Sequence, residues 1–542
     1  MDKLNKVFGL PSFRTNQLEA IIAALSGRDV FVLMPTGGGK SLCYQLPAVC
    51  KGGSTKGITV VVSPLLSLMT NQVSSLRDKN VDVVLWNSES TDVVEIMRRL
   101  RGNPKPSLLY VSPEKIKESG SLHSILTDLY RSNHLARFVI DEAHCISTWG
   151  QDFREAYQCL GSLRDNYPSV PIMALTATAN QVMADDIKRR LKLRDCECFS
   201  QSFNRSNLNY FILDKKGNLK GVIDDICSFI SSKHRDESGV IYCLARAKCE
   251  KVAEELRKKG ISAMHFHAGM AADVKNEVLQ DWQEGRVKIV VATIAFGMGI
   301  DKPDVRFVIH YDLPKSLDGY YQETGRAGRD GLPADCILYY SYRDYKLILK
   351  MINNPENTER LGREGLARLE AQARNVVEFC LNQSDCRRLQ LLQFFNEKFD
   401  PRLCRRQCDN CAYSGVVSQE DLTKEAKDVV ALVKHFQDRG EQVTLDHCRS
   451  VFKGAATTII RTKRHDQITY YGKGKHLANE LLEQLFKRLC LLGATDEVSM
   501  PAPNGWHNYY FQVSPVLGTH TFFLGFGDLE LITFCEAGTE CQ

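Results

Sequence analysis

A glycine-rich run followed by lysine and serine stands near the amino terminus of this chain. The run comprises Met34, Pro35, Thr36, Gly37, Gly38, Gly39, Lys40 and Ser41, and it follows the apolar stretch Val30–Leu33, which predicts a short buried strand. Backbone N–H groups of Thr36 and the three glycines can point at a phosphate chain, Lys40 can reach its β and γ phosphates, and Ser41 can hold Mg²⁺. The run therefore predicts binding of a nucleoside triphosphate, although Met34 stands where the strict pattern has glycine.

Two adjacent carboxylates end a second apolar stretch about 100 residues later. Phe138–Ile140 predicts a strand, and Asp141 and Glu142 follow it directly. Asp141 can bind the Mg²⁺ that the phosphates carry, and Glu142 can orient and deprotonate the attacking water. A solvated strand end is the alternative for such a pair. Together with the glycine-rich run, the pair indicates hydrolysis of the nucleotide.

Two arginines, Arg326 and Arg329, stand three residues apart in the segment 322–330. A γ-phosphoryl group in transfer spreads negative charge over its oxygens, and an inserted guanidinium stabilises that charge. On one helical turn, both side chains would face the same cleft. A pair of surface salt bridges is the alternative interpretation.

The composition limits the class of protein. A length of 542 residues predicts three or four domains, and 43% hydrophobic residues support sizeable cores. No apolar run reaches the length of a membrane span, and the first residues have no signal-peptide pattern. The net charge of +5 requires any nucleic-acid surface to be a local stripe. Nineteen cysteines without a secretory signal indicate reduced thiols or metal ligands inside a cell. Because the first motif lies so near residue 1, we expect an excised catalytic core.

The pattern of apolar runs predicts two consecutive α/β domains with parallel sheets. Expected strands of the first are Val30–Leu33, Ile58–Val62, Leu108–Val111, Phe138–Ile140 and Ile172–Leu175; the pattern restarts after Ser202–Leu208 with Val240–Cys243, Ala263–Phe266, Ile289–Ala292, Val305–Ile309 and Cys336–Tyr340. Because Lys40, Asp141 and Glu142 fall on the first sheet and the two arginines on the second, we expect the nucleotide between the domains. Binding would close this cleft and hydrolysis would open it.

Four cysteines near residue 400 have the spacing of a zinc site. Cys408 and Cys411 form a C-x-x-C pair, with Cys404 close by and Cys386 upstream. Cys380 is an alternative first ligand, and four reduced cysteines without a metal are the other possibility. Nearby arginines, Arg387, Arg388, Arg405 and Arg406, would offset the negative charge of the thiolates. The predicted Zn²⁺ is structural, because four sulfur ligands leave no open position.

The carboxyl-terminal part predicts a small separate domain. Lys424–Arg439, Leu445–Phe452 and Leu477–Leu491 have helical periodicity, and Thr495–Met500 with Tyr509–Ser514 predicts a hairpin whose turn contains Asn504-Gly505. A basic segment comprises Arg461, Lys463, Arg464, Lys473 and Lys475 and suits duplex phosphates. A solvated helix face is the alternative for that segment. The apolar tail 519–542 carries no recognisable role.

At this point the sequence resembles the RecQ DNA helicases of superfamily 2, in particular the branch of the Bloom-syndrome helicase and its fungal relatives. Phe13–Gln17 is similar to the adenine-reading motif, which implies base contacts from Arg14 and Gln17. Ser63–Leu68 and Val111–Glu114 resemble strand-tracking motifs, with Ser63 as a nucleic-acid contact. Leu175–Ala179 resembles the motif that couples hydrolysis to DNA, and Ala292–Lys302 resembles motif V.

The family also has an aromatic-rich loop that senses single-stranded DNA, and Cys145–Arg154 resembles it. Bases can stack on Trp149 and Phe153, at about 1–3 kcal/mol each, and Arg154 adds charge. The alternative is that both aromatics belong to the core. The resemblance further implies that the hairpin tip, with Trp506 as candidate, separates the first base pair, although Trp506 could equally pack the hairpin onto its domain.

The resemblance implies two RecA-like domains at 1–200 and 201–345, a helical zinc-binding subdomain at 346–415 and a winged-helix domain at 416–518. It implies an ATP- and Mg²⁺-dependent enzyme with Zn²⁺, moving 3′ to 5′ on single-stranded DNA and unwinding duplex or branched DNA in repair and recombination. His144 and Gln322 would relay the nucleotide state to the DNA groove. Topoisomerases, single-strand-binding proteins and a nuclear location are further implications. An RNA-remodelling ATPase of superfamily 2 and a non-enzymatic repair scaffold remain the alternatives.

Overall fold

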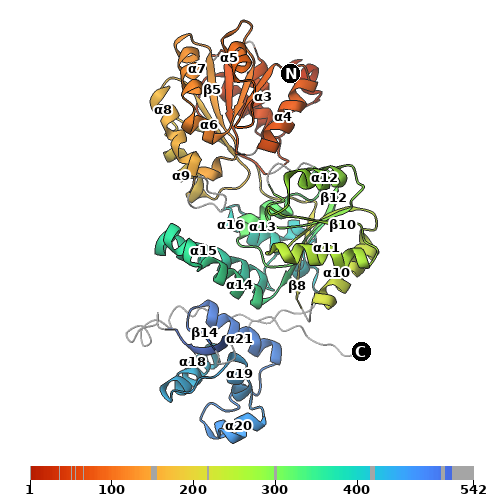
Figure 1. The fold of residues 1–542 in the computed structure, drawn as a ribbon. Helices are drawn as coiled ribbons and strands as arrows, with labels where there is room; N and C mark the ends of the chain where they lie inside the picture. Colours follow the sequence, from red (N-terminus) through yellow and green to blue (C-terminus); the bar gives the residue numbers. More distant parts are fainter. Residues whose placement is uncertain are drawn as a thin grey trace. The chain divides into compact units, whose positions relative to one another are not determined.

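The structure is a computed structural model that describes residues 2–35, 37–50, 52–54, 56–64, 66–147, 155–215, 219–297, 302–414, 421–501 and 507–514. The chain forms two compact units (Figure 1). The first unit contains two parallel sheets, and the second contains the carboxyl-terminal helices and a hairpin.

The first sheet is entirely parallel, with the strand order β3-β4-β2-β5-β6-β1-β7. Its strands are β1 (Val30–Leu33), β2 (Ile58–Val62), β3 (Val83–Trp86), β4 (Leu108–Val111), β5 (Leu135–Ile140), β6 (Ile172–Thr176) and β7 (Glu197–Ser200). All five strands predicted for this domain are present. Because the strands are parallel, their carboxyl ends meet at one edge, where the glycine-rich run and the paired carboxylates follow β1 and β5.

Helices cover both faces of this sheet, since alternate residues of each buried strand point to opposite sides. Val60 and Val62 pack in one core cluster, whereas Val61, between them, packs in the other. One cluster includes residues of α2 (Gln17–Leu25), α3 (Leu42–Val49) and α4 (Leu66–Asp78); the other includes residues of α5 (Val93–Arg101), α6 (Pro113–Glu118), α7 (Gly120–Arg131), η1 (Ala143–Ile146), η2 (Glu155–Gly161), α8 (Ser162–Asn166) and α9 (Gln181–Arg190). Helix α1 (Asp2–Phe8) precedes them.

The second sheet is also parallel, with the order β10-β11-β9-β12-β13-β8. Its strands are β8 (Leu208–Asp214), β9 (Ser238–Tyr242), β10 (Ala263–Phe266), β11 (Ile289–Ala292), β12 (Val305–His310) and β13 (Ala334–Tyr340). Helices α10 (Leu219–Lys233) and α11 (Arg246–Lys258) pack their apolar residues on one face. Helices α12 (Ala272–Gln283) and α13 (Leu317–Thr324) complete the domain.

Three strands, β3, β7 and β8, were not predicted from the sequence, and each lies at the edge of its sheet. An edge strand pairs on one side only, and polar or exposed residues interrupt the apolar pattern of β7 and β8, whereas β3 is apolar and mostly buried. In β7 the burial alternates between half-buried and exposed residues. Strand β8 begins at Leu208, the last residue of the segment that we interpreted as the start of a new domain.

A helical segment follows the second sheet. It contains α14 (Tyr342–Ile352), α15 (Pro355–Leu381), α16 (Arg387–Phe394), η3 (Pro401–Cys404) and α17 (Asp409–Ala412). Helix α15 is interrupted at Gly362, where φ is 63°. A positive φ favours glycine and breaks the helical repeat there. The predicted change from α/β to helical structure after the second sheet is confirmed.

The second unit has the winged-helix architecture that the sequence predicts. Its elements are α18 (Thr423–Asp438), α19 (Leu445–Lys453), α20 (Thr458–Thr462), η4 (His465–Gln467), α21 (Asn479–Leu491) and the antiparallel hairpin β14 (Thr495–Pro501) and β15 (His507–Val513). Phe436, Phe452, Phe486 and Phe511 form the centre of its core. The apolar faces of three helices and one strand thus close on each other, which gives this domain a core of its own.

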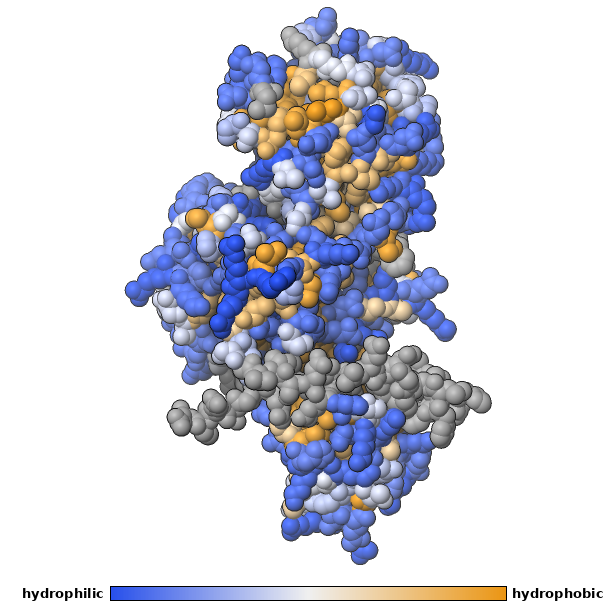
Figure 2. Space-filling model, turned by 180° about the vertical axis from the view of Figure 1, so that it is seen from behind, coloured by the Kyte–Doolittle hydropathy of each residue, from blue (hydrophilic) through white to orange (hydrophobic). Residues whose placement is uncertain are grey.

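Hydrophilic residues cover much of the face seen in Figure 2, and the apolar residues there gather in patches. None of the helices within the described ranges is long and apolar enough to cross a membrane.

Candidate nucleotide site and zinc cluster

The glycine-rich run forms a tight turn between β1 and α3. Gly38 N–H donates to the carbonyl of Pro35 at 2.8 Å, and Gly37 and Gly39 have φ of 80° and 84°. Residues other than glycine are strained at such angles, so the sequence has the residue that the turn needs. Lys40 Nζ donates to the Met34 carbonyl at 3.1 Å, across the turn. Lys40 and Ser41 stand at the amino end of α3, where free N–H groups and the helix dipole favour an anion.

Gln17 and Arg14 are bonded directly to this turn. Gln17 is 2% exposed, and its Nε2 donates to the carbonyl of Gly39 at 3.0 Å. Its Oε1 accepts from the backbone N–H of Arg14 at 2.7 Å, and Arg14 Nη1 donates to the Gly37 carbonyl. A Cβ on Gly39 would lie 2.2 Å from Gln17 Nε2, so a larger residue here would displace the Gln17 amide from the turn. The predicted base-contact pair therefore lies against the predicted phosphate turn.

The paired carboxylates stand at the carboxyl end of β5, next to β2 and β6. Asp141 is 5% exposed, its N–H donates to the Val62 carbonyl, and its own carbonyl accepts from the Tyr157 hydroxyl at 2.9 Å. Glu142 has a φ of 48°, which turns the chain sharply after the strand. Its Oε2 lies 3.3 Å from His144 Nδ1, and that nitrogen is also 2.9 Å from the Thr176 hydroxyl at the end of β6.

Charges at this sheet edge influence one another strongly. Burial, together with the neighbouring Glu142, raises the pKa of Asp141 to about 7, and Lys40 opposes both effects. Burial lowers the pKa of Lys40, the two carboxylates raise it, and Arg329 lowers it again. A buried carboxylate beside a second carboxylate is incompletely compensated by one lysine. The donor set of Asp141 and the Ser41 hydroxyl therefore fits a dication such as Mg²⁺, which prefers oxygen ligands.

The two predicted arginines stand in the turns that follow α13, rather than on a helical turn, because the helix ends at Thr324. Their surroundings differ as a result. The Arg329 Cγ lies 3.9 Å from the place that a Cβ on Gly37 would take, so Arg329 reaches the glycine-rich turn of the first domain. Arg326 is 5% exposed and lies near Tyr242 and Gly297 of the second domain. Arg329 is the better placed of the two to meet a nucleotide.

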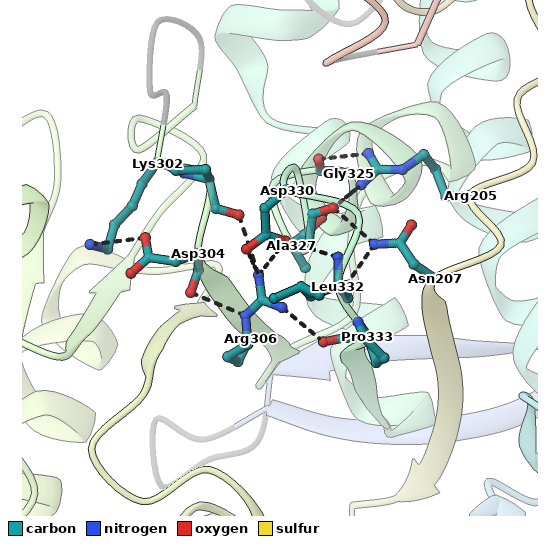
Figure 3. Close-up of polar contacts among 12 residues, drawn as sticks. Arg205, Asn207, Lys302, Asp304, Arg306, Gly325, Ala327, Asp330, Leu332 and Pro333 are labelled. Carbon is teal, nitrogen blue, oxygen red and sulfur yellow. Dashed lines mark hydrogen bonds and ion pairs between the residues drawn. The ribbon is translucent and has the colours of Figure 1, made fainter.

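Arg205 and Asn207 hold the turn that carries the arginines (Figure 3). Arg205 donates to the carbonyls of Gly325 at 3.3 Å, Ala327 at 3.0 Å and Gly328 at 2.8 Å. Asn207 Nδ2 donates to the carbonyls of Gly328 and Leu332, each at 2.8 Å. The sequence pattern indicated only a domain boundary at this segment. A polar Arg-x-Asn between two apolar runs is the signal that was available there.

A second arginine fixes the other side of the same turn. Arg306 Nη2 lies 2.7 Å from both carboxylate oxygens of Asp330, and Arg306 also donates to the carbonyls of Pro303, Asp304 and Pro333 (Figure 3). Burial opposes ionisation of Asp330, but the hydrogen bonds from Arg306 hold the pKa of this carboxyl below its ordinary value. Hydrogen bonds from guanidinium groups on both sides therefore hold the turn in place.

A pocket of about 280 Å³ opens where these groups meet. Its lining consists of Arg14, Pro35, Gly37, Gly38, Arg205, Asn207, Gly328, Arg329, Asp330 and Gly331. It therefore takes residues from both α/β domains of the first unit. Three guanidinium groups and the backbone of the glycine-rich turn give it the chemistry of a polyphosphate site.

The four predicted zinc ligands form a cluster. The Sγ atoms of Cys386, Cys404, Cys408 and Cys411 all lie within 4.8 Å of one another. Hydrogen bonds with Cys404 and Cys408, and then burial, raise the pKa of the Cys386 thiol far above its ordinary value. Four sulfurs gathered in this way are the ligand set of a structural Zn²⁺. Cys380 lies on α15 and is not a member of this cluster.

The arginines near the cysteines have structural partners. Arg387 Nε and Nη2 lie 2.9 Å and 3.1 Å from the two oxygens of Asp409. Arg388 is 2% exposed and donates to the carbonyls of Arg205, Ser206 and Leu208. Both guanidiniums are thus engaged in structural hydrogen bonds, and their offset of the thiolate charge stays a prediction. Arg405 and Arg406 have φ of 51° and 61° and lie at the surface.

Comparison with known proteins agrees with this geometry. The chain matches the DEAD/DEAH box helicase family over residues 14–186, the helicase conserved C-terminal domain over 221–331, the RecQ zinc-binding family over 342–412 and the RQC domain over 417–515. It is 40% identical over 502 residues to the ATP-dependent DNA helicase RecQ of Pasteurella multocida, covering 92% of this chain and 75% of that protein. The chain belongs to the RecQ helicase family.

Eukaryotic RecQ proteins are similar over most of the chain. The ATP-dependent helicase SGS1 of Saccharomyces cerevisiae is 44% identical over 519 residues, or 95% of this chain and 35% of that protein. The ATP-dependent DNA helicase hus2/rqh1 of Schizosaccharomyces pombe is 45% identical over 492 residues, or 90% and 36%. The chain thus spans about a third of the length of these two relatives.

Solved helicase structures share the RecQ chain's fold. The helicase MrfA bound to DNA covers 70% of this chain with a TM-score of 0.52 at 18% identity, and the match takes in 56% of that protein. The DEAD-box helicase Mss116 bound to ssRNA and UDP-BeF also covers 70% with a TM-score of 0.52, at 15% identity, over 90% of that protein. The likeness confirms the predicted architecture of two tandem RecA-like domains.

The remaining predicted contacts of the RecQ chain stay predictions. Ser63 follows β2 and is 1% exposed. Arg461, Lys463 and Arg464 are exposed on α20 and the turn after it, whereas Lys473 pairs with Asp428 at 2.6 Å. Thr36, Trp149, Phe153, Arg154 and Trp506 lie outside the described residues.

Removal of zinc from the RecQ chain tests the cysteine cluster. We expect one zinc per chain by elemental analysis, and loss of that zinc in Cys408→Ser. Because metal binding supplies folding free energy, the variant or a strong chelator should unfold the helical segment, seen as faster proteolysis between α15 and α17.

Two matched serine variants serve as controls for this experiment. Cys198→Ser changes an exposed cysteine, and Cys380→Ser changes the alternative ligand; both should keep the zinc. Loss of zinc in Cys380→Ser with retention in Cys386→Ser would make Cys380 the first ligand in place of Cys386.

Proposed function

We propose that this chain is an ATP-dependent DNA helicase that moves 3′ to 5′ on single-stranded DNA and unwinds duplex or branched DNA in repair and recombination. The observation that carries the proposal is the pocket formed by the glycine-rich turn of one α/β domain and Arg329 of the other. A nucleotide in such a pocket would hold the two domains together, and its hydrolysis would release them. Membership of the RecQ family supports DNA as the track.

Each side chain of the candidate nucleotide site has a proposed role. The amides of Thr36 to Gly39 and the ammonium of Lys40 bind the phosphates, and Arg14 with Gln17 reads the base. Ser41 and Asp141 hold Mg²⁺, which supplies charge neutralisation at the phosphates when bound. Glu142 accepts a proton from the attacking water. The His144 side chain holds the Glu142 carboxylate in place.

Arg329 stabilises the charge of the γ-phosphoryl group in transfer, and Arg326 supports it from the second domain. His144 and Gln322 relay the nucleotide state. The contact of His144 with Thr176 supports this relay, because Thr176 lies in the segment proposed to couple hydrolysis to DNA.

The nucleic-acid contacts are proposed on residue chemistry. Trp149 and Phe153 stack on bases, Arg154 and Ser63 contact the strand, and Trp506 is the candidate wedge at the duplex. Arg461, Lys463 and Arg464 bind duplex phosphates from the winged-helix domain, and their exposure supports this role. We further propose the domain limits 1–200, 201–345, 346–415 and 416–518, topoisomerases and single-strand-binding proteins as partners, and the nucleus as location.

Steady-state ATP hydrolysis tests the proposal. We expect strong stimulation by single-stranded DNA and little by RNA, and a loss of about 100-fold or more in Lys40→Ala, because a phosphate contact made in the transition state is removed. A strand-displacement assay should show unwinding of a duplex with a 3′ tail and not of one with a 5′ tail.

Lys6→Ala is the control, since it removes a lysine whose side chain is 72% exposed and paired with Asp2. Equal stimulation by RNA would favour an RNA-remodelling ATPase. Absence of hydrolysis under every condition would favour a non-enzymatic scaffold.

Arg205→Ala should lower kcat by about 10- to 100-fold with a small change in KM, because the arginine turn loses three hydrogen bonds and Arg329 is displaced. Arg28→Ala, which removes an exposed partner of Glu197, is the control. A rise in KM at unchanged kcat would instead indicate that Arg205 binds the nucleotide directly.

The basic segment predicts a change in salt dependence. Arg461→Ala combined with Lys463→Ala should weaken duplex binding and reduce the slope of log K against log salt by about 1 for each phosphate that the protein no longer neutralises. Lys473→Ala should have less effect, because Lys473 is already paired with Asp428. Equal effects of all three substitutions would show that the segment acts only through net charge.

A further inference from the structure

A group of metal-binding side chains unrelated to the zinc cysteines lies on the second α/β domain. His265 is on the edge strand β10, and His267 follows the end of that strand. Residues two apart on a strand point to the same face. The two imidazole rings accordingly stack, with centroids 5.5 Å apart and an interplanar angle of 21°.

Glu250, on helix α11, completes the group. Its Oε1 lies 2.9 Å from Nε2 of His267. One ligand atom from each of Glu250, His265 and His267 lies within 4.8 Å of the other two. His267 is 5% exposed, while the side chain of Glu250 is 52% exposed, so the group is anchored in the domain and open to solvent on one side.

One ring nitrogen of each histidine makes no hydrogen bond within the described residues and is available to bind a metal ion. Nδ1 of His265 and Nδ1 of His267 are both buried and have no hydrogen-bond partner among the described residues. An unpaired buried polar atom is unfavourable, so such atoms are uncommon. A simple Glu–His ion pair accounts for the contact of Glu250 with His267, but it does not account for the second imidazole stacked beside them.

The donor set selects the class of ion. Two imidazoles and one carboxylate suit Zn²⁺ and the neighbouring transition metals, whereas Mg²⁺ and Ca²⁺ prefer oxygen ligands alone. We propose that Glu250, His265 and His267 form a second transition-metal site, of the Zn²⁺ class, with an open fourth position. Ligand atoms within 4.8 Å need only a small side-chain movement to reach the bond lengths of about 2.0–2.2 Å that Zn²⁺ forms with nitrogen and oxygen.

Nearby charges limit the affinity of this site. The Nη1 of Arg246 and the Nδ1 of His267 lie 3.1 Å and 3.4 Å from the place that a Cβ on Gly269 would take. Arg257 Nη1 donates to the Ala263 carbonyl on the same strand. Two guanidiniums beside a site with a single negative ligand weaken cation binding. The ion is therefore exchangeable, in contrast to the zinc of the four cysteines.

The position of the site gives the ion a structural effect. The carbonyl of Phe266, between the two histidines, accepts a hydrogen bond from Thr293 N–H at 3.3 Å, and the Phe266 ring packs edge-on against Phe296 at 4.9 Å. Thr293 and Phe296 belong to the segment that resembles motif V. A bound ion would join α11 to the strand end that supports this segment.

Metal titration of the full chain tests the proposal. The protein is first freed of loosely bound ions with a mild chelator and shown by elemental analysis to keep one zinc. Equilibrium dialysis against ZnCl₂ should then show one further ion bound, and Glu250→Gln and His265→Ala should each weaken this binding by about tenfold or more. Both variants change solvent-accessible side chains, and unchanged melting temperatures without added metal would show that they fold.

Two further measurements separate this site from others. His476→Ala removes a histidine that lies 3.4 Å from Glu425 in the winged-helix domain, and it should leave the titration unchanged. Co²⁺ bound at the proposed site should show visible ligand-field bands without the thiolate charge-transfer band that cysteine binding produces. No uptake beyond the zinc already held, unchanged affinity in Glu250→Gln and His265→Ala, or a thiolate spectrum for the added ion would each overturn the proposal.

Discussion

The buried carboxylate of Asp141 sets a requirement that the rest of the nucleotide site meets. It lies at the end of β5 beside Glu142, and its burial there raises its pKa to about 7. Such a group is stable in its ionised form only next to positive charge. Lys40 supplies one such charge from the glycine-rich turn, and Arg329 approaches that turn from the second domain. The negative charge at one sheet edge therefore explains why cationic groups from two domains converge on it.

The convergence depends on a turn without regular secondary structure. Helix α13 ends before Arg326, and the following residues take their shape from Arg205, Asn207 and Arg306, which bind the turn from outside. Hydrogen bonds between guanidinium groups and several carbonyls define position better than single contacts do, because each fixes a direction as well as a distance. The turn that carries Arg326 and Arg329 is in this way held in place without a helix.

Residues with strong local patterns were predictable from the sequence, and those that act through distant contacts were not. The buried strands of both sheets, the glycine-rich turn and the cysteine cluster follow from periodicity and spacing alone. The edge strands β7 and β8 were missed because polar and exposed residues interrupt their apolar pattern, whereas β3 is apolar and mostly buried and could have been predicted. The role of Arg205 was missed because its partners lie about 120 residues away, and no local pattern records such a contact. The helical turn expected for Arg326 and Arg329 is not formed because the helix ends at Thr324 and Gly328, between the two arginines, has a φ of 57°.

Arg388 links the zinc-binding segment to the turn that carries Arg329, although the two are far apart in the sequence. Its guanidinium donates hydrogen bonds to the carbonyls of Arg205, Ser206 and Leu208. The Arg205 side chain in turn donates hydrogen bonds to the turn that presents Arg329. Arg388 follows the first zinc ligand by two residues. The effect of a cysteine substitution would thus pass through two successive arginines to the turn that carries Arg329. A variant in this segment could then be mistaken for an active-site mutation, although no atom of the active site had been altered.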